Sequence, residues 1–342
     1  MKKGAIFVIS LLLGLLVAFA IYQHIGFEQV FKKLTLFNGW QLIALFSFTA
    51  LRVLVWILKW RLILKKFECK DMPFLKLAAS RVAEIAVSYT TPGVYWGGEA
   101  IRIFSLKKHH KVSVTKATTT VLLDRLFDLF GFSLFLAIGF VIAVLTTNFV
   151  VASILFLAII IAIIGLYLGL RVFGIKKILG WGVKFLHLNQ IKSISNGKSV
   201  IIASKLKQVG HEIVEFLKKG PKHWFSIVLI SSLAFFFEVA QILVFFLFLN
   251  KNLPGIMDLF VAKTVIIFSS LLSFIPGNVG IYEGASVLGF NMVNLSAKLG
   301  LTFSLLTRFF DILFVAFGAV ILISYGGIFL AKFLNNTSDK NC

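Results

Sequence analysis

The sequence predicts an all-α integral membrane protein, with about six transmembrane helices plus two Pro-Gly re-entrant helical hairpins arranged as an inverted repeat. Hydrophobic residues make up 59% of the 342 residues and charged residues only 14%, a composition far outside that of soluble domains. Apolar runs long enough to cross a bilayer core of about 30 Å recur along the chain. A set of polar residues also occurs twice, in the same order, in two membrane-length halves.

The apolar runs place the elements in order along the chain. Full spans are expected near 4–22, 40–58, 117–145, 149–170, 224–249 and 301–330. The apolar stretches 74–104 and 259–293 are each interrupted by a Pro-Gly pair. We therefore interpret each as two half-helices that dip into the membrane and return. The alternative is that each hairpin is two short tilted spans, which leaves the parity of the crossings unchanged.

The repeat is defined by the two Pro-Gly breaks and by charged residues that follow them at one spacing, with a single one-residue slip. The matched pairs are Pro92 and Pro276, Gly93 and Gly277, Glu99 and Glu283, Arg125 and Arg308, and Asp128 and Asp311. Between equivalent points the chain is expected to cross the bilayer an odd number of times. The two halves should then be inverted, with their tips meeting near the midplane, which is the geometry of alternating access.

The distribution of positive charge predicts the orientation. The formal net charge is +21, but the cations are spread over the loops between spans and no nucleic-acid-binding motif accompanies them. Most of the Lys and Arg residues fall on one side if the N-terminus is inside, as the positive-inside rule requires. The sequence therefore predicts a multi-pass protein of the cell (cytoplasmic) membrane with both termini cytoplasmic, and no nucleic-acid partner.

A single membrane domain is expected over residues 1–335, followed by a disordered tail at 336–342. Its repeats are about 40–145 and 224–330, joined by a span at 149–171 and a basic cytoplasmic linker at 172–222. The linker is expected to lie as an amphipathic helix on the inner membrane surface. The alternative is a solvated topological anchor.

Other segments predict little chemistry. The N-terminal run resembles a cleavable signal peptide, but its length favours an uncleaved span. Cys69 and Cys342 are far apart, and no metal-protease or nucleotide-hydrolysis motif is present. No metal and no cofactor are expected.

Charged residues inside predicted membrane segments are the candidate substrate-binding residues, because a charge at the bilayer centre costs about 2.5–3.5 kcal/mol or more. They are Glu99, Arg102, Asp124, Arg125, Asp128, Glu283, Arg308 and Asp311. The arginines are expected to hold a phosphate through their planar forks, with Asp128 and Asp311 positioning them. Glu99 and Glu283 are expected to orient the hairpins or to bind a cationic headgroup. The alternative is that the Arg–Asp pairs are ion pairs that lock the bundle, with Glu99 and Glu283 capping the broken hairpins.

The two halves are not equal in charge. Arg102 corresponds to Ser286 and Asp124 to Thr307, so an anionic substrate is expected nearer the first hairpin. Arg52 lies deep in a span, where a pair with Glu84 or Glu238 is slightly favoured over substrate contact. Trp56 is interpreted as an interfacial belt residue rather than as a stacking platform.

Glycines cluster at each break, where they allow sharp turns and close backbone approach. The residues assigned to the breaks are Pro92, Gly93, Gly97 and Gly98 in the first hairpin and Pro276, Gly277 and Gly280 in the second. Exposed N–H groups at half-helix N-termini favour an anion there, although tight helix packing explains the glycines equally well.

These motifs resemble those of the lysylphosphatidylglycerol synthase/flippase transmembrane-domain family, the membrane half of the multiple peptide resistance factor. The matching segments are RVLVWILKWRLIL at 52–64, TTPGVYWGGEAIR at 90–102, DRLFD at 124–128, FIPGNVGIYEG at 274–284 and TRFFD at 307–311. The resemblance covers about residues 5–330. It implies a flippase-like module that moves a phospholipid or a polyprenyl-phosphate-linked headgroup between leaflets. The expected partners are membrane lipids, and a homo-oligomer is left open.

The full resistance factor also carries a cytosolic aminoacyl-transfer domain, which this sequence lacks, so the chain is not expected to be an enzyme. Two alternatives remain open. One is a membrane-embedded glycosyltransferase that uses a lipid-phosphate sugar, with Glu99 or Asp124 as the general base. The other is an ion-coupled transporter of a small polar solute.

Overall fold

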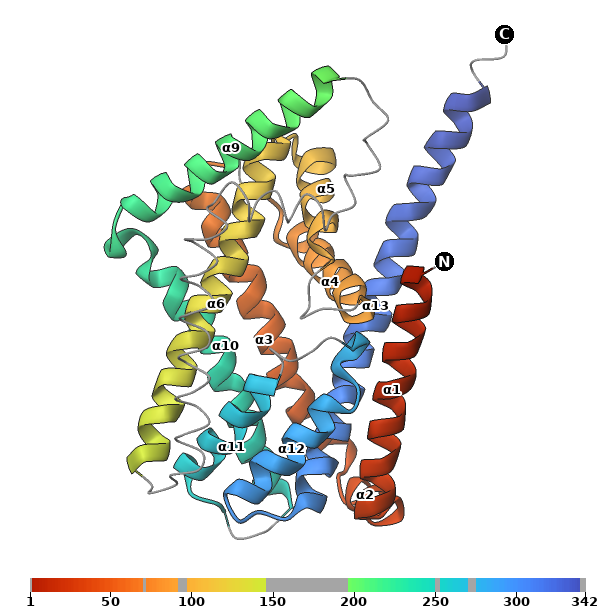
Figure 1. Ribbon diagram of the computed structural model, residues 1–342, viewed down its shortest axis with the longest axis vertical. Coiled ribbons are helices and arrows are strands. Elements are labelled where there is room, and N and C mark those ends of the chain that lie inside the picture. Colours follow the sequence, from red (N-terminus) through yellow and green to blue (C-terminus); the bar gives the residue numbers. More distant parts are fainter. Residues whose placement is uncertain are drawn as a thin grey trace.

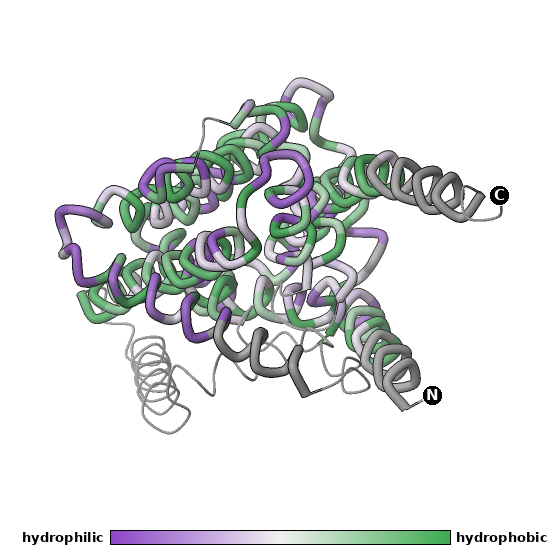
Figure 2. The backbone as a smooth tube through the Cα atoms, turned by 90° about the horizontal axis from the view of Figure 1, so that it is seen from above, coloured by the Kyte–Doolittle hydropathy of each residue, from purple (hydrophilic) through white to green (hydrophobic). Residues whose placement is uncertain are grey.

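The computed structural model describes residues 2–69, 72–91, 97–145, 196–249, 253–269 and 275–338, and every regular element in these ranges is a helix. The elements are α1 (Lys2–Ile25), α2 (Phe27–Leu34), α3 (Gly39–Lys66), α4 (Phe74–Thr90), α5 (Glu99–His110), α6 (Val114–Leu145), α9 (Asn196–Lys218), α10 (Pro221–Phe248), α11 (Ile256–Ser269), the 3-10 turn η3 (Pro276–Asn278), α12 (Ile281–Met292) and α13 (Ala297–Ser338). Seen end-on, the helices form a bundle along which hydrophobic residues predominate (Figure 2).

Four described helices are long and apolar enough to cross a membrane: α3, α6, α10 and the Ala297–Ser324 part of α13. They coincide with four of the expected spans and confirm an all-α membrane protein. The first expected span lies in α1, which meets α2 at an angle of 86°, and this bent pair is a candidate for a fifth crossing. The expected span at 149–170 lies outside the described residues. The helix α13 continues to Ser338, three residues into the segment expected to be a disordered tail.

The same order of elements occurs twice. A long helix, two short helices on either side of a Pro-Gly segment, and a second long helix are found as α3 to α6 and again as α10 to α13. The packing is reciprocal, because α4 packs on α13, α11 packs on α6, and α3 packs on α10. In Figure 1 the pair α4 and α5 lies toward the end of the bundle that carries α9, and α11 and α12 lie toward the opposite end.

Local sequence signals explain where several helices begin and end. The side chain of Asn38 accepts a hydrogen bond from the backbone of Gln41 at 3.1 Å, and the side chain of Gln41 accepts one from the backbone of Asn38 at 3.0 Å. This reciprocal cap starts α3. The helix α4 ends at Thr90 because the next residue precedes Pro92, and Thr91 is accordingly extended, with φ −89° and ψ 140°.

Small residues allow the two halves to interlock. A Cβ added to Gly318 on α13 would lie 2.3 Å from the carbonyl oxygen of Val82 on α4, and one added to Gly139 on α6 would lie 2.4 Å from Oγ1 of Thr264 on α11. Such contacts let helix backbones approach closely without a hydrophobic driving force between them. The short helices of each half are thereby held against the other half.

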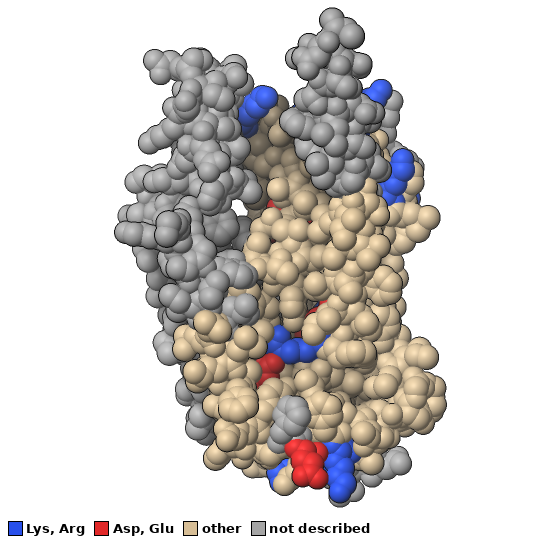
Figure 3. All heavy atoms as spheres, turned by 90° about the vertical axis from the view of Figure 1, so that its right-hand side faces the viewer, with Lys and Arg blue, Asp and Glu red and all other residues tan. Residues whose placement is uncertain are grey.

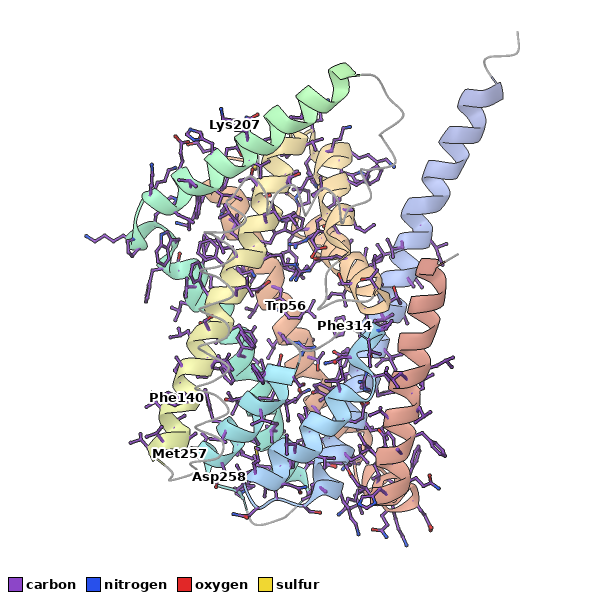
Figure 4. All side chains as sticks on the ribbon, in the orientation of Figure 1. Trp56, Phe140, Lys207, Met257, Asp258 and Phe314 are labelled. Atoms are coloured by element: carbon purple, nitrogen blue, oxygen red, sulfur yellow. The ribbon has the colours of Figure 1, made fainter. Side chains whose placement is uncertain are left out.

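Of the 172–222 linker the structure describes residues 196–222, and most of these form α9, which lies across one end of the bundle (Figure 1). Phe216 is buried and stacks on Phe67 at 5.2 Å, and Thr119 donates a hydrogen bond of 2.7 Å to Glu212. Lys205 and Lys207 are exposed, and Figure 4 shows Lys207 on α9 at this end. The helix is therefore docked on the bundle by one face and basic on the other.

Candidate functional site

A cavity of about 220 Å³ lies between the two halves of the bundle. Its charged lining consists of Arg52, Arg81, Glu84, Arg125, Asp128, Glu238, Lys263 and Asp311. These side chains come from α3, α4, α6, α10, α11 and α13, so both halves contribute. Four are basic and four are acidic, and the cavity wall is therefore strongly polar but electrically balanced.

The cavity lies about midway along the long apolar helices, because Arg52 and Asp311, which line it, lie near the middle of Gly39–Lys66 and Ala297–Ser324. Trp56 and Phe314, which both line it, lie in the middle of the bundle in Figure 4. Figure 3 shows acidic and basic atoms in a recess somewhat below the middle of one face, with further charged atoms at the upper and lower ends of that face. Apolar side chains such as Phe132 and Phe235 complete the lining. A ligand with a charged group and an apolar portion would find partners for both.

The first half contains a network of buried ion pairs centred on two acids. Asp124 is fully buried and binds Lys59 at 2.9 Å, Arg102 at 2.7 Å and Arg81 at 3.2 Å. Glu84 binds Arg81 and Arg125 at 2.7 Å each and Arg102 at 2.9 Å. Each acid thus shares its oxygens among three cations, and removing one acid would strand several buried positive charges.

Arg125 joins this network to the first break. Its Nε donates to Glu99 at 2.8 Å, while its nearest approach to Asp128 is a loose 3.9 Å. Asp128 binds Lys59 instead. The expectation that Asp128 positions Arg125 is therefore met only weakly, because Lys59 on the neighbouring α3 is the closer cation.

The second half has its own smaller network at the cavity wall. Arg52 binds Glu238 at 3.0 Å and Asp311 at 2.7 Å, and Lys263 binds Glu238 at 2.7 Å. The favoured pairing of Arg52 with Glu238 is thus observed. Asp311 pairs with Arg52 across the two halves, whereas Arg308, the expected partner of Asp311, is bound by Glu283.

The duplicated glutamates hold the chain where the helices are broken. Glu99 accepts a hydrogen bond of 2.7 Å from the backbone N–H of Gly97, and Glu283 accepts one of 2.7 Å from that of Gly280. Each is also bound by the arginine of the following long helix. Backbone groups freed by a break must be satisfied within a membrane, and the repeated Glu–Arg pair does this in both halves.

Arg308 satisfies the second break most directly. Its two terminal nitrogens donate to the carbonyl oxygens of Gly277 and Asn278, both at 2.7 Å. An arginine can serve two carbonyls and a carboxylate together because it carries five N–H donors. Arg308 is thus a structural part of the break.

The structure separates the eight predicted binding residues into two groups. Arg125, Asp128 and Asp311 line the cavity. The other five lie behind the cavity wall or at the breaks: Glu99, Arg102, Asp124, Glu283 and Arg308. Arg102 is fully buried against Trp60 and two acids and does not line the cavity, and the binding of an anion beside it stays a prediction.

Of the residues predicted to form the breaks, the structure describes five and leaves two outside the described ranges. Pro92 and Gly93 lie outside the described residues. Gly97 and Gly280 have φ of 135° and 83°, values that favour glycine. A Cβ on Gly98 would lie 2.3 Å from the carbonyl oxygen of Glu84. Pro276 is buried in η3, and Gly277 follows it.

Sequence reasoning missed part of the cavity. Lys263 is a lone charge within the otherwise apolar second half of α11, a signal that could have identified it. Glu84 was expected only as a possible partner of Arg52, and Arg81 belongs to none of the duplicated motifs. Trp56 is not a belt residue, because Arg52 and Arg81 each lie 5.2 Å from its ring at the cavity wall.

Within the described part of the chain, no three His, Cys, Asp or Glu side chains are grouped as metal ligands. The fold and the cavity together define a helical multi-pass membrane protein with its polar residues gathered at the centre of the bundle. The sequence matches the family described as the lysylphosphatidylglycerol synthase TM region over residues 7–318. The chain belongs to this family, which confirms what the motifs indicated.

Several archaeal proteins are similar over nearly the whole chain. A UPF0104 membrane protein of Pyrococcus horikoshii is 25% identical over 316 residues, which cover 90% of this chain and 92% of the relative. One of Methanocaldococcus jannaschii is 23% identical over 312 residues, covering 88% and 89%. One of Methanothermobacter thermautotrophicus is 25% identical over 319 residues, covering 88% of each.

Proposed function

We propose that this protein moves the polar headgroup of a membrane lipid, a phospholipid or a polyprenyl-phosphate conjugate, between the two leaflets. The headgroup would enter the cavity between the two halves while the apolar tail stays in the bilayer. In this proposal α4–α5 and α11–α12 are re-entrant hairpins related by an inverted repeat, and transport alternates between their two sides.

The observation that carries the proposal is the balanced set of charges around the cavity. Burying charged groups in a membrane is costly unless they pair or face a polar ligand. Four basic and four acidic side chains face one cavity at the centre of the bundle. If these charges served only the stability of the fold, no cavity would be needed between them. Apolar side chains of the same volume would give a protein that is equally stable or more stable.

Membership of a family named for a lipid synthase region supports a lipid cargo rather than a water-soluble one. The apolar wall provided by Phe132, Phe235 and Leu129 supports it too. Reciprocal packing of α4 on α13 and of α11 on α6 supports two equivalent halves that exchange roles.

The test is lipid movement by the purified chain reconstituted into vesicles. Labelled phospholipid or polyprenyl phosphate should become accessible from the opposite leaflet in the presence of the protein. Arg125→Ala and Asp128→Asn, which alter the cavity wall, should slow this at least about tenfold, a loss of roughly 1.4 kcal/mol of transition-state stabilisation. The exposed Lys107→Ala is the matched control.

Three results would count against the proposal. The proposal would be wrong if the wild-type protein moved neither the labelled phospholipid nor the labelled polyprenyl phosphate. Uptake of a small polar solute without lipid movement would instead indicate a solute transporter. Formation of a glycosylated product from a lipid-phosphate sugar would indicate a glycosyltransferase.

A further inference from the structure

We propose that Lys263 and Asn278 form a binding site for a phosphate group in the second half of the cavity. This site rests on the proposed function and refines it, because it gives the anionic part of the ligand a defined position. It also moves that position from the first hairpin to the second break.

Lys263 has unused hydrogen-bonding capacity. Its side chain is 2% exposed and lines the cavity, and its ammonium group faces the rings of Tyr282 and Phe303 at 5.9 and 5.7 Å. Among the described residues the oxygen that binds it is that of Glu238, at 2.7 Å. An ammonium group carries three N–H donors, so Glu238 leaves two of them without an oxygen partner among the described residues.

Asn278 provides a second unsatisfied group. It is 5% exposed, lines the same cavity, and its side-chain oxygen has no hydrogen-bond partner among the described residues. Its backbone has a φ of 55° and its carbonyl oxygen is held by Arg308, so the side chain is fixed at the break. A buried side-chain oxygen without a partner is costly, and a 180° turn of the amide would place its NH₂ group at the same position, where it can donate to an anion.

The other cations of the cavity are more fully occupied. Arg52, Arg81 and Arg125 each contact two or more carboxylates. An anion that bound any of them would have to compete with acids already in place. At Lys263 it would compete with the single carboxylate of Glu238.

The balance of charge points to a singly charged phosphate. Lys263 and Arg52 carry two positive charges. The carboxylates of Glu238 and Asp311, which bind them, already offset both. A phosphodiester, with one negative charge, adds less repulsion than a dianionic monoester. Its two free oxygens can accept from the ammonium group and from the amide together.

The experiment measures binding by the full chain purified in detergent, as the rise in thermal unfolding temperature with increasing probe. The probes are inorganic phosphate, dioctanoylphosphatidylglycerol and dioctanoylglycerol, which lacks phosphate. The wild-type protein should bind the phospholipid and not dioctanoylglycerol. A response to inorganic phosphate that Lys263→Gln abolishes would assign the site to free phosphate as well, and a response to the phospholipid alone would assign it to the lipid headgroup.

The variants decide which residues bind. Lys263→Gln should weaken phospholipid binding at least about tenfold, Lys263→Arg should restore most of it, and Asn278→Gly, which keeps the left-handed backbone, should weaken it several-fold. The exposed Lys107→Gln should bind as the wild type does. Wild-type affinity in a monodisperse Lys263→Gln protein would overturn the site, and if that variant does not fold, wild-type affinity in Asn278→Gly would do so.

The site and the proposed function fail in different ways. If Lys263→Gln loses phospholipid binding but the wild-type protein moves no lipid in vesicles, the site stands and the transport proposal falls. If the wild-type protein moves lipid and Lys263→Gln binds it unchanged, the transport proposal stands and the site falls.

Discussion

Arg308 on α13 donates a hydrogen bond of 3.1 Å to the hydroxyl of Tyr89 on α4, and the Tyr89 ring covers the Gly277 backbone that Arg308 also binds. The last turn of α4 in the first half therefore lies directly on the break of the second half. This contact brings the two equivalent segments of the repeat together at the centre of the molecule. Movement of one half against the other would have to break it.

Gly277→Ala should destabilise the protein. Gly277 has a φ of 62°, and an added Cβ would lie 2.9 Å from Cε1 of Tyr89. The left-handed conformation alone costs a residue with a Cβ about 1–2 kcal/mol, and the contact with Tyr89 adds to it. The thermal unfolding temperature in detergent should fall. Gly39→Ala is the control, since a Cβ there meets nothing within 4 Å, and an equal unfolding temperature for both variants would contradict the packing.

Asp124→Asn should be among the most damaging conservative substitutions. It removes the buried acid shared by Lys59, Arg81 and Arg102, and stranding a buried charge costs roughly 3–5 kcal/mol. We expect a large loss of folded protein in size-exclusion chromatography. Glu28→Gln, at an exposed position of α2, should behave as the wild type. A well-folded Asp124→Asn protein would show that the fold does not depend on the ion pairs of Asp124 with Lys59, Arg81 and Arg102.

Phe216→Ala should release α9 from the bundle without unfolding the rest. The Phe216 ring is buried against Phe67, Phe127 and His223, and removing a buried phenyl ring costs about 3–5 kcal/mol. Amide hydrogen exchange should increase in α9 and stay unchanged in α3 and α10. Lys207→Ala, on the exposed face, is the control. Exchange that rises throughout the bundle would argue against a separately docked helix.

Cys69 should react slowly with maleimides and from one side only. Burial raises the pKa of the Cys69 thiol above its ordinary value, and Lys116 opposes this only in part. The thiolate is the reactive form, so at pH 7 less of it is present than for a free thiol, and the labelling rate should rise about tenfold per pH unit below that pKa. Labelling is measured in a Cys342→Ser background, with protein unfolded in detergent as the faster-reacting control.

The same labelling tests the expected orientation of the chain. An impermeant maleimide should reach Cys69 in inverted vesicles and not in right-side-out vesicles, because the loop between α3 and α4 is expected to face the cytoplasm. Labelling from the outer side would reverse the assignment of both hairpins.

The order of the helices was predictable from the sequence because apolar runs and Pro-Gly interruptions are local signals. The apolar runs near 40–58 and 117–145 lie within α3 and α6. The Pro-Gly pair at Pro276 lies between α11 and α12. The repeat identified Glu99, Glu283, Arg125 and Arg308 as a related set. A capping role for Glu99 and Glu283 at the breaks was among the alternatives that the sequence offered. The bonds from Arg308 to the Gly277 and Asn278 carbonyls were not predictable, because they depend on backbone groups that are freed only when the chain folds.

The sequence by itself determined that this is a helical membrane protein of the lysylphosphatidylglycerol synthase transmembrane-region family, since composition, hydrophobic length and motif spacing are properties of the chain alone. Only the tertiary structure decided which charges face the cavity. Arg102 and Lys263 are both buried cations, but packing encloses Arg102 between Glu84 and Asp124 and leaves Lys263 at the cavity wall. That difference is set by how α5 lies against α4 and α6 and by how α11 lies against α6 and α12, and the local sequence of a helix does not specify its distance from the others.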